Sequence, residues 1–198
     1  MPVPDWLAGQ HIDGTIQIAA LSVGETRLER VRGRLMWDAL KVELTGIQAR
    51  VENGSVTGAL AVNVRGARPA YRLVSRVRAM DCRSGKVDTE TVLETAGTGA
   101  DLLENLRAEG TFNGRALEMA SLPPVKSVSG SYKFAWSRKA PRLLLTDLQL
   151  ATGTEVFTGR GATQDDGRLL VQLSNGSREM RVSGSLAQLH VDETPRVQ

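Results

Sequence analysis

The chain has 198 residues and a formal net charge of +3; 41% of its residues are hydrophobic, 24% are charged and only 4% are aromatic. This composition is typical of a folded domain rather than a disordered chain, and so small a net charge gives no argument for nucleic-acid binding. Cys82 is the single cysteine, no apolar run reaches the roughly 20 residues of a membrane span, and the N-terminus lacks the pattern of a signal peptide.

Alternating apolar residues separated by turn dipeptides predict β-strands along the first part of the chain. Ile16 and Ile18 alternate with polar neighbours after Asp13-Gly14, and the alternation continues through residues 26–44. Asn53-Gly54 predicts a hairpin turn, because both residues tolerate the left-handed backbone that a two-residue turn needs. One side of the following strand is apolar and carries Val56, Leu60, Val62 and Val64.

The next strand has an apolar side and a basic side. Tyr71, Leu73 and Val77 lie on the first, and they alternate with three arginines on the second, Arg72, Arg76 and Arg78. A row of arginines suits anionic headgroups or phosphates, but it is also the usual solvated side of a strand, where charge prevents edge pairing. We favour the second interpretation, because surface charge is rarely functional.

Residues 99–106 interrupt the period of two. Leu102, Leu103 and Leu106 are spaced as on one face of a helix, so we expect one short helix of two to three turns that caps an end of the sheet. Gly97-Thr98-Gly99 before this helix hints at a phosphate-binding loop. The third glycine of that motif and a surrounding βαβ unit are missing, so the signal is weak.

Strand patterns return in the second half of the chain, over residues 107–117, 128–136, 143–150 and 155–163. The last clear unit lies between Asp166-Gly167 and Asn175-Gly176, which predict two-residue turns at its ends. After the second turn the alternation continues to Leu186, with a bend or bulge expected at Gly184. We expect residues 191–198 to be a polar tail.

Residues suited to catalysis or metal binding are scarce. His11 and His190 stand at opposite ends of the chain without ligand-spaced partners, so neither a metal site nor a serine triad is predicted. Asp165-Asp166 is better explained by a turn than by a pair of catalytic carboxylates. We therefore expect no enzyme activity and no cofactor.

The predicted fold is all-β: one domain over residues 1–198, a long antiparallel meander sheet curled into a groove or an open sandwich, with one short helix near 99–106. The inward aliphatic rows are the remaining candidate for function, as a lining that contacts lipid. The alternative for these rows is the filled core of a closed sandwich. The candidate lining residues are Val56, Leu60, Val62, Val64, Tyr71, Leu73, Leu144, Leu148, Leu150, Leu169, Val171, Leu173, Met180, Val182 and Leu186.

Three stretches, residues 14–66, 100–117 and 143–186, together resemble the C-terminal part of AsmA-family envelope proteins. The likeness covers roughly Asp13 to Leu189 and lies in the rhythm of strands and glycines. The resemblance implies a periplasmic β-groove whose apolar interior carries phospholipid acyl chains between the inner and outer membranes in outer-membrane biogenesis, without enzyme activity. It also implies an N-terminal inner-membrane helix, which this chain lacks; a C-terminal fragment of a longer anchored protein would explain the difference.

Two other functions remain open from the sequence. One is a closed β-sandwich that serves as a scaffold or protein-interaction module in envelope assembly, with other envelope proteins as partners at its ends. The other is a carbohydrate-binding or hydrolytic sandwich, for which Trp37, Tyr132 and Trp136 are the available aromatic residues and no paired acid accompanies them. We rank the carbohydrate-binding or hydrolytic function last.

Overall fold

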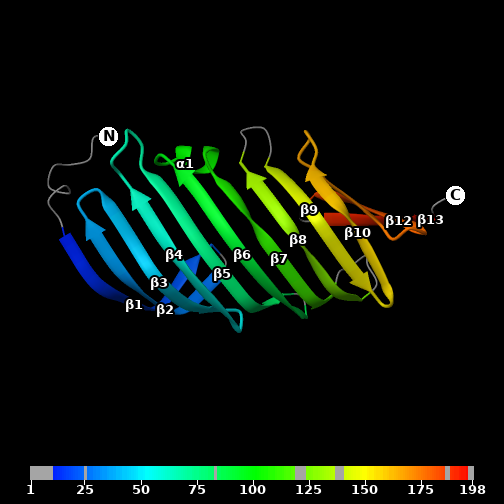
Figure 1. The fold of residues 1–198 in the computed structure, drawn as a ribbon, viewed down its shortest axis with the longest axis horizontal. Coiled ribbons are helices and arrows are strands. Elements are labelled where there is room, and N and C mark those ends of the chain that lie inside the picture. The colour runs from blue at the N-terminus through cyan, green and yellow to red at the C-terminus, as the bar shows by residue number, and fades with distance from the viewer. Residues whose placement is uncertain are drawn as a thin grey trace. The chain divides into compact units, whose positions relative to one another are not determined.

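The computed structural model describes residues 11–24, 26–82, 84–118, 124–136, 141–185 and 188–195, and these form one antiparallel sheet of 13 strands with a single short helix (Figure 1). Each strand is hydrogen-bonded to the next strand in sequence, so the predicted all-β meander is confirmed. The elements are β1 (His11–Val23), β2 (Thr26–Asp38), β3 (Lys41–Val51), β4 (Gly54–Asn63), β5 (Ala70–Cys82), β6 (Gly85–Ala96), α1 (Asp101–Glu104), β7 (Arg107–Leu117), β8 (Val125–Ala135), β9 (Arg142–Thr152), β10 (Glu155–Thr163), β11 (Leu169–Ser174), β12 (Arg178–Ser185) and β13 (Gln188–Pro195).

The contacts within the chain divide it into two compact units. Unit 1 contains Met1–Met80 and Thr89–Leu106, and unit 2 contains Asp81–Asp88 and Arg107–Gln198. Strands β1 to β4, most of β5 and β6, and helix α1 thus belong to unit 1, whereas β7 to β13 belong to unit 2.

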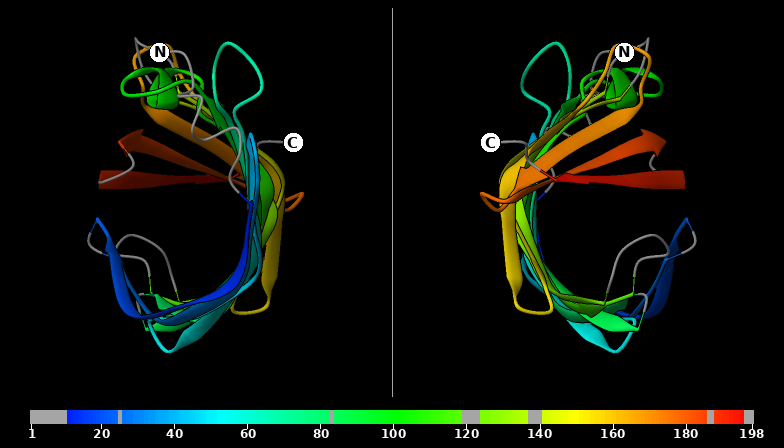
Figure 2. Two further views of the ribbon diagram at one scale, coloured as in Figure 1. Left: turned by 90° about the vertical axis from the view of Figure 1, so that its left-hand side faces the viewer. Right: turned by 90° about the vertical axis from the view of Figure 1, so that its right-hand side faces the viewer.

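Glycines on β4 bend the sheet of unit 1. A Cβ atom at Gly58 would lie 2.4 Å from the carbonyl oxygen of Val74, and one at Gly54 would lie 2.6 Å from that of Arg78. Only glycine allows β5 to approach β4 so closely on this side of the sheet. The sheet of unit 1 is therefore concave on the face that carries Gly54 and Gly58. Figure 2 shows the arc that the unit-1 strands (blue to cyan) follow.

Bulges change which residues face the concave side. In β3, Gly46 has φ +59° and the register with β4 shifts between Leu44 and Ile47, so the apolar positions continue one residue later than strict alternation predicts. In β9, Asp147 has φ +53° and the register shifts against both β8 and β10. Residues of β9 on either side of Asp147 therefore follow opposite parity.

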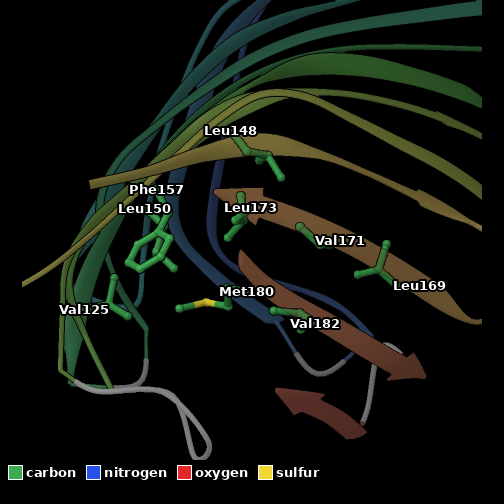
Figure 3. Close-up of a cluster of buried hydrophobic side chains, with 9 residues drawn as sticks. All are labelled: Val125, Leu148, Leu150, Phe157, Leu169, Val171, Leu173, Met180 and Val182. Carbon is green, nitrogen blue, oxygen red and sulfur yellow. The ribbon is translucent and has the colours of Figure 1, made fainter. Parts of the chain in front are cut away.

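Unit 2 encloses a hydrophobic core. Side chains from β8 to β12 meet in it, and Figure 3 shows them pointing toward one another: Val125, Leu148, Leu150, Phe157, Leu169, Val171, Leu173, Met180 and Val182. Two glycines of β10 allow this packing, because a Cβ at Gly159 would lie 1.9 Å from the carbonyl oxygen of Gln172 and one at Gly161 would lie 2.7 Å from Cγ2 of Val171. Strand β11 also contacts β9, although β10 lies between them in the sheet.

The turns follow local side-chain chemistry. Glu52 and Asn53, with φ values of +41° and +59°, form the two-residue turn between the paired residues Val51 and Gly54, one position earlier than the dipeptide Asn53-Gly54 suggests. After β11, Oδ1 of Asn175 accepts hydrogen bonds from the backbone N–H groups of Ser177 and Arg178, at 3.2 Å and 2.9 Å. This Asx turn uses more residues than the predicted two-residue connection.

Two other expectations are corrected. Helix α1 has four residues, a single turn rather than two or three, because Asn105 ends it and β7 begins at Arg107. The Asn105 side chain donates to the carbonyl oxygen of Ala96 at 3.0 Å, which ties the turn to the end of β6. The predicted polar tail begins as part of a strand, since β13 runs from Gln188 to Pro195 and pairs with β12.

A bulge at Gly184 is not found either. Gly184 has φ +138°, but its pairing with Leu169 and Leu189 continues the registers of β11 and β13 without a shift. Gly184 therefore adopts a positive φ without inserting an extra residue into the strand.

Candidate functional site

The concave side of unit 1 is a continuous apolar surface across five strands. Residues directly opposite each other in an antiparallel pair share a face, so the registers place Val42, Val62 and Tyr71 in one row and Leu44, Leu60 and Leu73 in the next. We call this surface the unit-1 apolar face. Its members are Ile12, Ile16 and Ile18 on β1, Val31, Leu35 and Trp37 on β2, Val42, Leu44, Ile47, Ala49 and Val51 on β3, Val56, Leu60 and Val62 on β4, and Tyr71, Leu73 and Val77 on β5.

Most of the unit-1 apolar face stays accessible. Only Val31, Ala49 and Val51 are fully buried, while Ile12 and Ile18 on β1 are 43% and 39% exposed. The residues of β4 and β5 on this face are half-buried. Among the described residues, no second layer of side chains covers it as the core of unit 2 is covered. The face can therefore accept an apolar ligand without first displacing a packed core.

Several predicted lining residues lie on this face. Val56, Leu60 and Val62 on β4 and Tyr71 and Leu73 on β5 project from it in adjacent rows. Val64 follows the end of β4, where its backbone N–H donates to the carbonyl oxygen of Leu40 at 2.9 Å, and it is half-buried at the rim.

Other predicted lining residues belong to the core of unit 2. They are at most 8% exposed and pack against one another rather than facing an open surface: Leu148, Leu150, Leu169, Val171, Leu173, Met180 and Val182. In this unit the structure thus shows the filled core that was the alternative interpretation of the aliphatic rows.

Leu144 is a correction. It is 44% exposed and pairs with Lys133 and Ala162, on the face opposite the core. Leu145 takes the core-facing position instead, because the bulge at Asp147 reverses the parity of β9 between Leu145 and Leu148. Leu186, the last predicted lining residue, lies outside the described residues.

The sequence prediction of the lining missed the residues of β1 to β3. Ile16 and Ile18 alternate with polar residues in the sequence, as do Leu35 and Trp37, so the signal for a strand was present. What alternation within single strands does not show is that these strands share a face with β4 and β5, because that depends on the registers in which the strands pair.

The opposite face of unit 1 carries ion pairs. Arg72 contacts Glu94 at 3.1 Å, and Arg76 and Arg78 both contact Glu90 at 3.0 Å, so the arginine row predicted from the sequence is paired with carboxylates of β6. All of these side chains are exposed, and such pairs contribute at most about 1 kcal/mol each. The pairing supports the structural interpretation of the row over an anion-binding one.

One ion pair on this side is bidentate. Nε and Nη2 of Arg34 donate to Oδ1 and Oδ2 of Asp13 at 2.9 Å and 2.6 Å, linking β2 to β1. The hydrogen bond from Arg34 lowers the pKa of the Asp13 carboxyl, and the bond to Asp13 raises the pKa of Arg34.

The remaining polar candidates have structural roles. Nδ1 of His11 lies 2.9 Å from Oδ1 of Asp38 across the β1–β2 pair, and Oδ1 of Asp166 accepts from the backbone N–H of Arg168 at 2.9 Å in a turn. The described ranges contain no group of three or more His, Cys, Asp or Glu side chains placed to hold a metal ion. Nor do they contain a helix with the length and hydropathy of a membrane span.

Two clefts on polar parts of the surface have mixed charge. One, of about 880 Å³ in unit 2, is bordered by Arg160 and Arg181 but also by Asp147 and Glu179. The other, of about 580 Å³ in unit 1, lies beside the β3–β4 turn and is bordered by arginines and glutamates alike. The first cleft has two residues of each charge and the second has three arginines to two glutamates, so neither has the strong excess of one charge that would select an ionic ligand.

Comparison of the chain with protein-family models, with curated proteins and with solved structures found no match.

Proposed function

We propose that this chain is a non-enzymatic lipid-binding protein of the cell envelope, in which the unit-1 apolar face holds the acyl chains of phospholipids. The observation that carries the proposal is a concave aliphatic face that remains accessible, in contrast to the filled core of unit 2. The resemblance of residues 14–66, 100–117 and 143–186 to AsmA-family proteins extends the proposal to a periplasmic location and to movement of lipid between the two membranes.

The dimensions of the face suit an acyl chain. Between Val56 and Val62, β4 advances by about 20 Å, since a strand rises about 3.3 Å per residue. An acyl chain occupies about half of the roughly 30 Å hydrocarbon core of a bilayer. Each CH₂ group that is buried contributes about 0.8 kcal/mol, so contact along such a length offsets much of the cost of leaving the membrane.

A scaffold role is the second candidate, and it is favoured by unit 2. Its core is filled by its own side chains, as in a closed sandwich, and offers an apolar ligand no accessible surface there. Unit 2 then serves as a rigid support or as a contact for other envelope proteins, while unit 1 holds the lipid.

Site-specific photo-cross-linking tests the lipid proposal. A benzophenone amino acid replaces Leu60, on the unit-1 apolar face, or Thr57, which is exposed on the opposite face of the same strand. Protein purified from cells is irradiated, and the adducts are identified by mass spectrometry. We expect phospholipid adducts at position 60 and none at position 57.

Absence of lipid adducts at both positions, together with native mass spectra that show no bound lipid, would overturn the proposal. Equal amounts of adduct at both positions would indicate that lipid associates non-specifically with both faces, and this result would also contradict the proposal.

A further inference from the structure

Strand β1 is an unprotected edge of the sheet. It has 13 residues and pairs only with β2 among the described residues, so its other side carries a row of backbone N–H and C=O groups that no described strand satisfies. Exposed edges of this kind associate with other strands unless charge, proline or a bulge prevents it.

The two edges of the sheet differ in their protection. β13, the opposite edge, contains the exposed Asp192, whose charge opposes the addition of another strand. β1 has no lysine and no proline, and its only ionisable residues, His11 and Asp13, lie at one end. Both are already bound to β2 of the same chain, through Asp38 and Arg34.

The sequence of β1 is complementary to itself in antiparallel pairing. When two copies pair over the full length from position 11 to position 23, Gln17 lies opposite Gln17 of the second copy, and Ile16 lies opposite Ile18 of the second copy. Asp13 then lies opposite Leu21, so no like charges meet. Even-numbered residues oppose even-numbered residues, which keeps Ile12, Ile16 and Ile18 on one face across the pair.

We infer that the protein forms a two-fold symmetric dimer by antiparallel pairing of β1 with β1 of a second copy. The backbone groups of the edge become hydrogen-bonded, and Ile12 and Ile18 of β1, exposed in one chain, gain apolar neighbours across the pair. The unit-1 apolar face then continues from one copy to the other. The inference goes beyond lipid binding and does not depend on it, because the pairing requires only the edge strand.

Cysteine cross-linking tests the register of this dimer. In a Cys82→Ser background, Gln17→Cys places two thiols opposite each other, with Cβ atoms about 5 Å apart, within reach of a disulfide after a small adjustment. Thr15→Cys is the matched control: it is exposed on the same face of the same strand, but its equivalent in the second copy lies about 14 Å away. Under mild oxidation we expect a disulfide-linked dimer for Gln17→Cys and none for Thr15→Cys.

Sedimentation equilibrium of the full chain measures the association itself. We expect the unmodified protein to dimerise and Gln17→Lys to raise the dimer Kd about fivefold, because it places two lysines opposite each other at the two-fold axis. An equimolar mixture of Gln17→Lys and Gln17→Glu should restore dimerisation as a mixed dimer. Thr111→Lys adds the same charge to β7, an interior strand, and should leave the Kd unchanged.

A monomeric wild-type protein would overturn the inference, and so would cross-linking of Thr15→Cys in preference to Gln17→Cys. A dimer that Gln17→Lys and Thr111→Lys weaken equally would also overturn it, since that dimer would use another surface. Circular dichroism confirms that each variant is folded, and the lipid content of the protein does not enter either measurement.

Discussion

Replacing three leucines of β9 with alanine tests the bulge on which the assignment of faces in unit 2 depends. Strict alternation puts Leu144 on the same face as Leu148, whereas the bulge at Asp147 puts Leu145 there instead. We expect Leu148→Ala to destabilise the protein strongly, Leu145→Ala to an intermediate extent, and Leu144→Ala very little.

The magnitudes follow from burial. Leu148 is 5% exposed within the core, so its truncation should cost about 3–5 kcal/mol, the transfer free energy of the lost methyl groups plus a cavity. Leu145 is half-buried against that core, which gives about 1–2 kcal/mol. Leu144 is 44% exposed, and surface truncations usually change stability by no more than about 0.5 kcal/mol.

Urea unfolding followed by tryptophan fluorescence measures these differences. Trp136 lies next to β8 in unit 2, so a background with Trp6→Phe and Trp37→Phe makes the signal specific for that unit. A variant that lowers the unfolding midpoint without changing the m-value reports a loss of stability. If Leu144→Ala costs as much as Leu148→Ala while Leu145→Ala is neutral, β9 has no bulge and the assignment of its faces is wrong.

Three further predictions concern burial, close approach and ionisation. Phe157→Ala should lower the free energy of unfolding in urea by about 3–5 kcal/mol, because Phe157 is 2% exposed. Val156→Ala should lower it by less than about 1 kcal/mol, because Val156, on the opposite face, is 54% exposed. Equal losses of stability would contradict the placement of Phe157 in the core. Gly159→Ala should lower the thermal midpoint or prevent folding, since the new Cβ atom would lie 1.9 Å from the carbonyl oxygen of Gln172. Gly14→Ala should be tolerated, because a Cβ atom there would have no other atom within 4 Å. Similar behaviour of the two variants would argue against tight packing of β10 on β11. In Arg34→Gln the pKa of Asp13, measured by NMR titration, should rise toward its ordinary value of about 4. Because the native pKa is lowered, the stabilisation from this pair is present above the ordinary pKa and is lost as the pH falls through the native pKa. An unchanged titration of Asp13 in the variant would show that the pair does not form in solution.

Period-two alternation was enough to predict the meander. The strand of residues 169–174 is an example, with Leu169, Val171 and Leu173 on one face in the sequence and in the structure. Its end was less predictable, because the three-residue Asx turn at Asn175 depends on side-chain hydrogen bonds that the dipeptide Asn-Gly does not specify.

The face of each residue was harder to predict than the strand it belongs to. A bulge inserts one residue, after which every later side chain in the strand changes sides. Gly46 in β3 gives a hint in the sequence, but Asp147 in β9 gives only a weak one, since most aspartates have negative φ even though aspartate adopts positive φ more often than most residues. Leu144 was therefore assigned to the wrong side.

The difference between an accessible apolar face and a closed core was not predictable from alternation either, because both come from the same pattern. What separates them is how closely non-adjacent strands approach. In unit 2, Gly159 and Gly161 let β11 come close enough for Leu173 to meet Leu148 and Phe157, and the apolar side fills itself. In unit 1, the glycines of β4 bend the sheet, but the described strands β1 to β5 stay side by side and leave their leucines and isoleucines accessible. The glycine positions, more than the hydrophobic positions, thus determine which part of this sheet is available to a ligand.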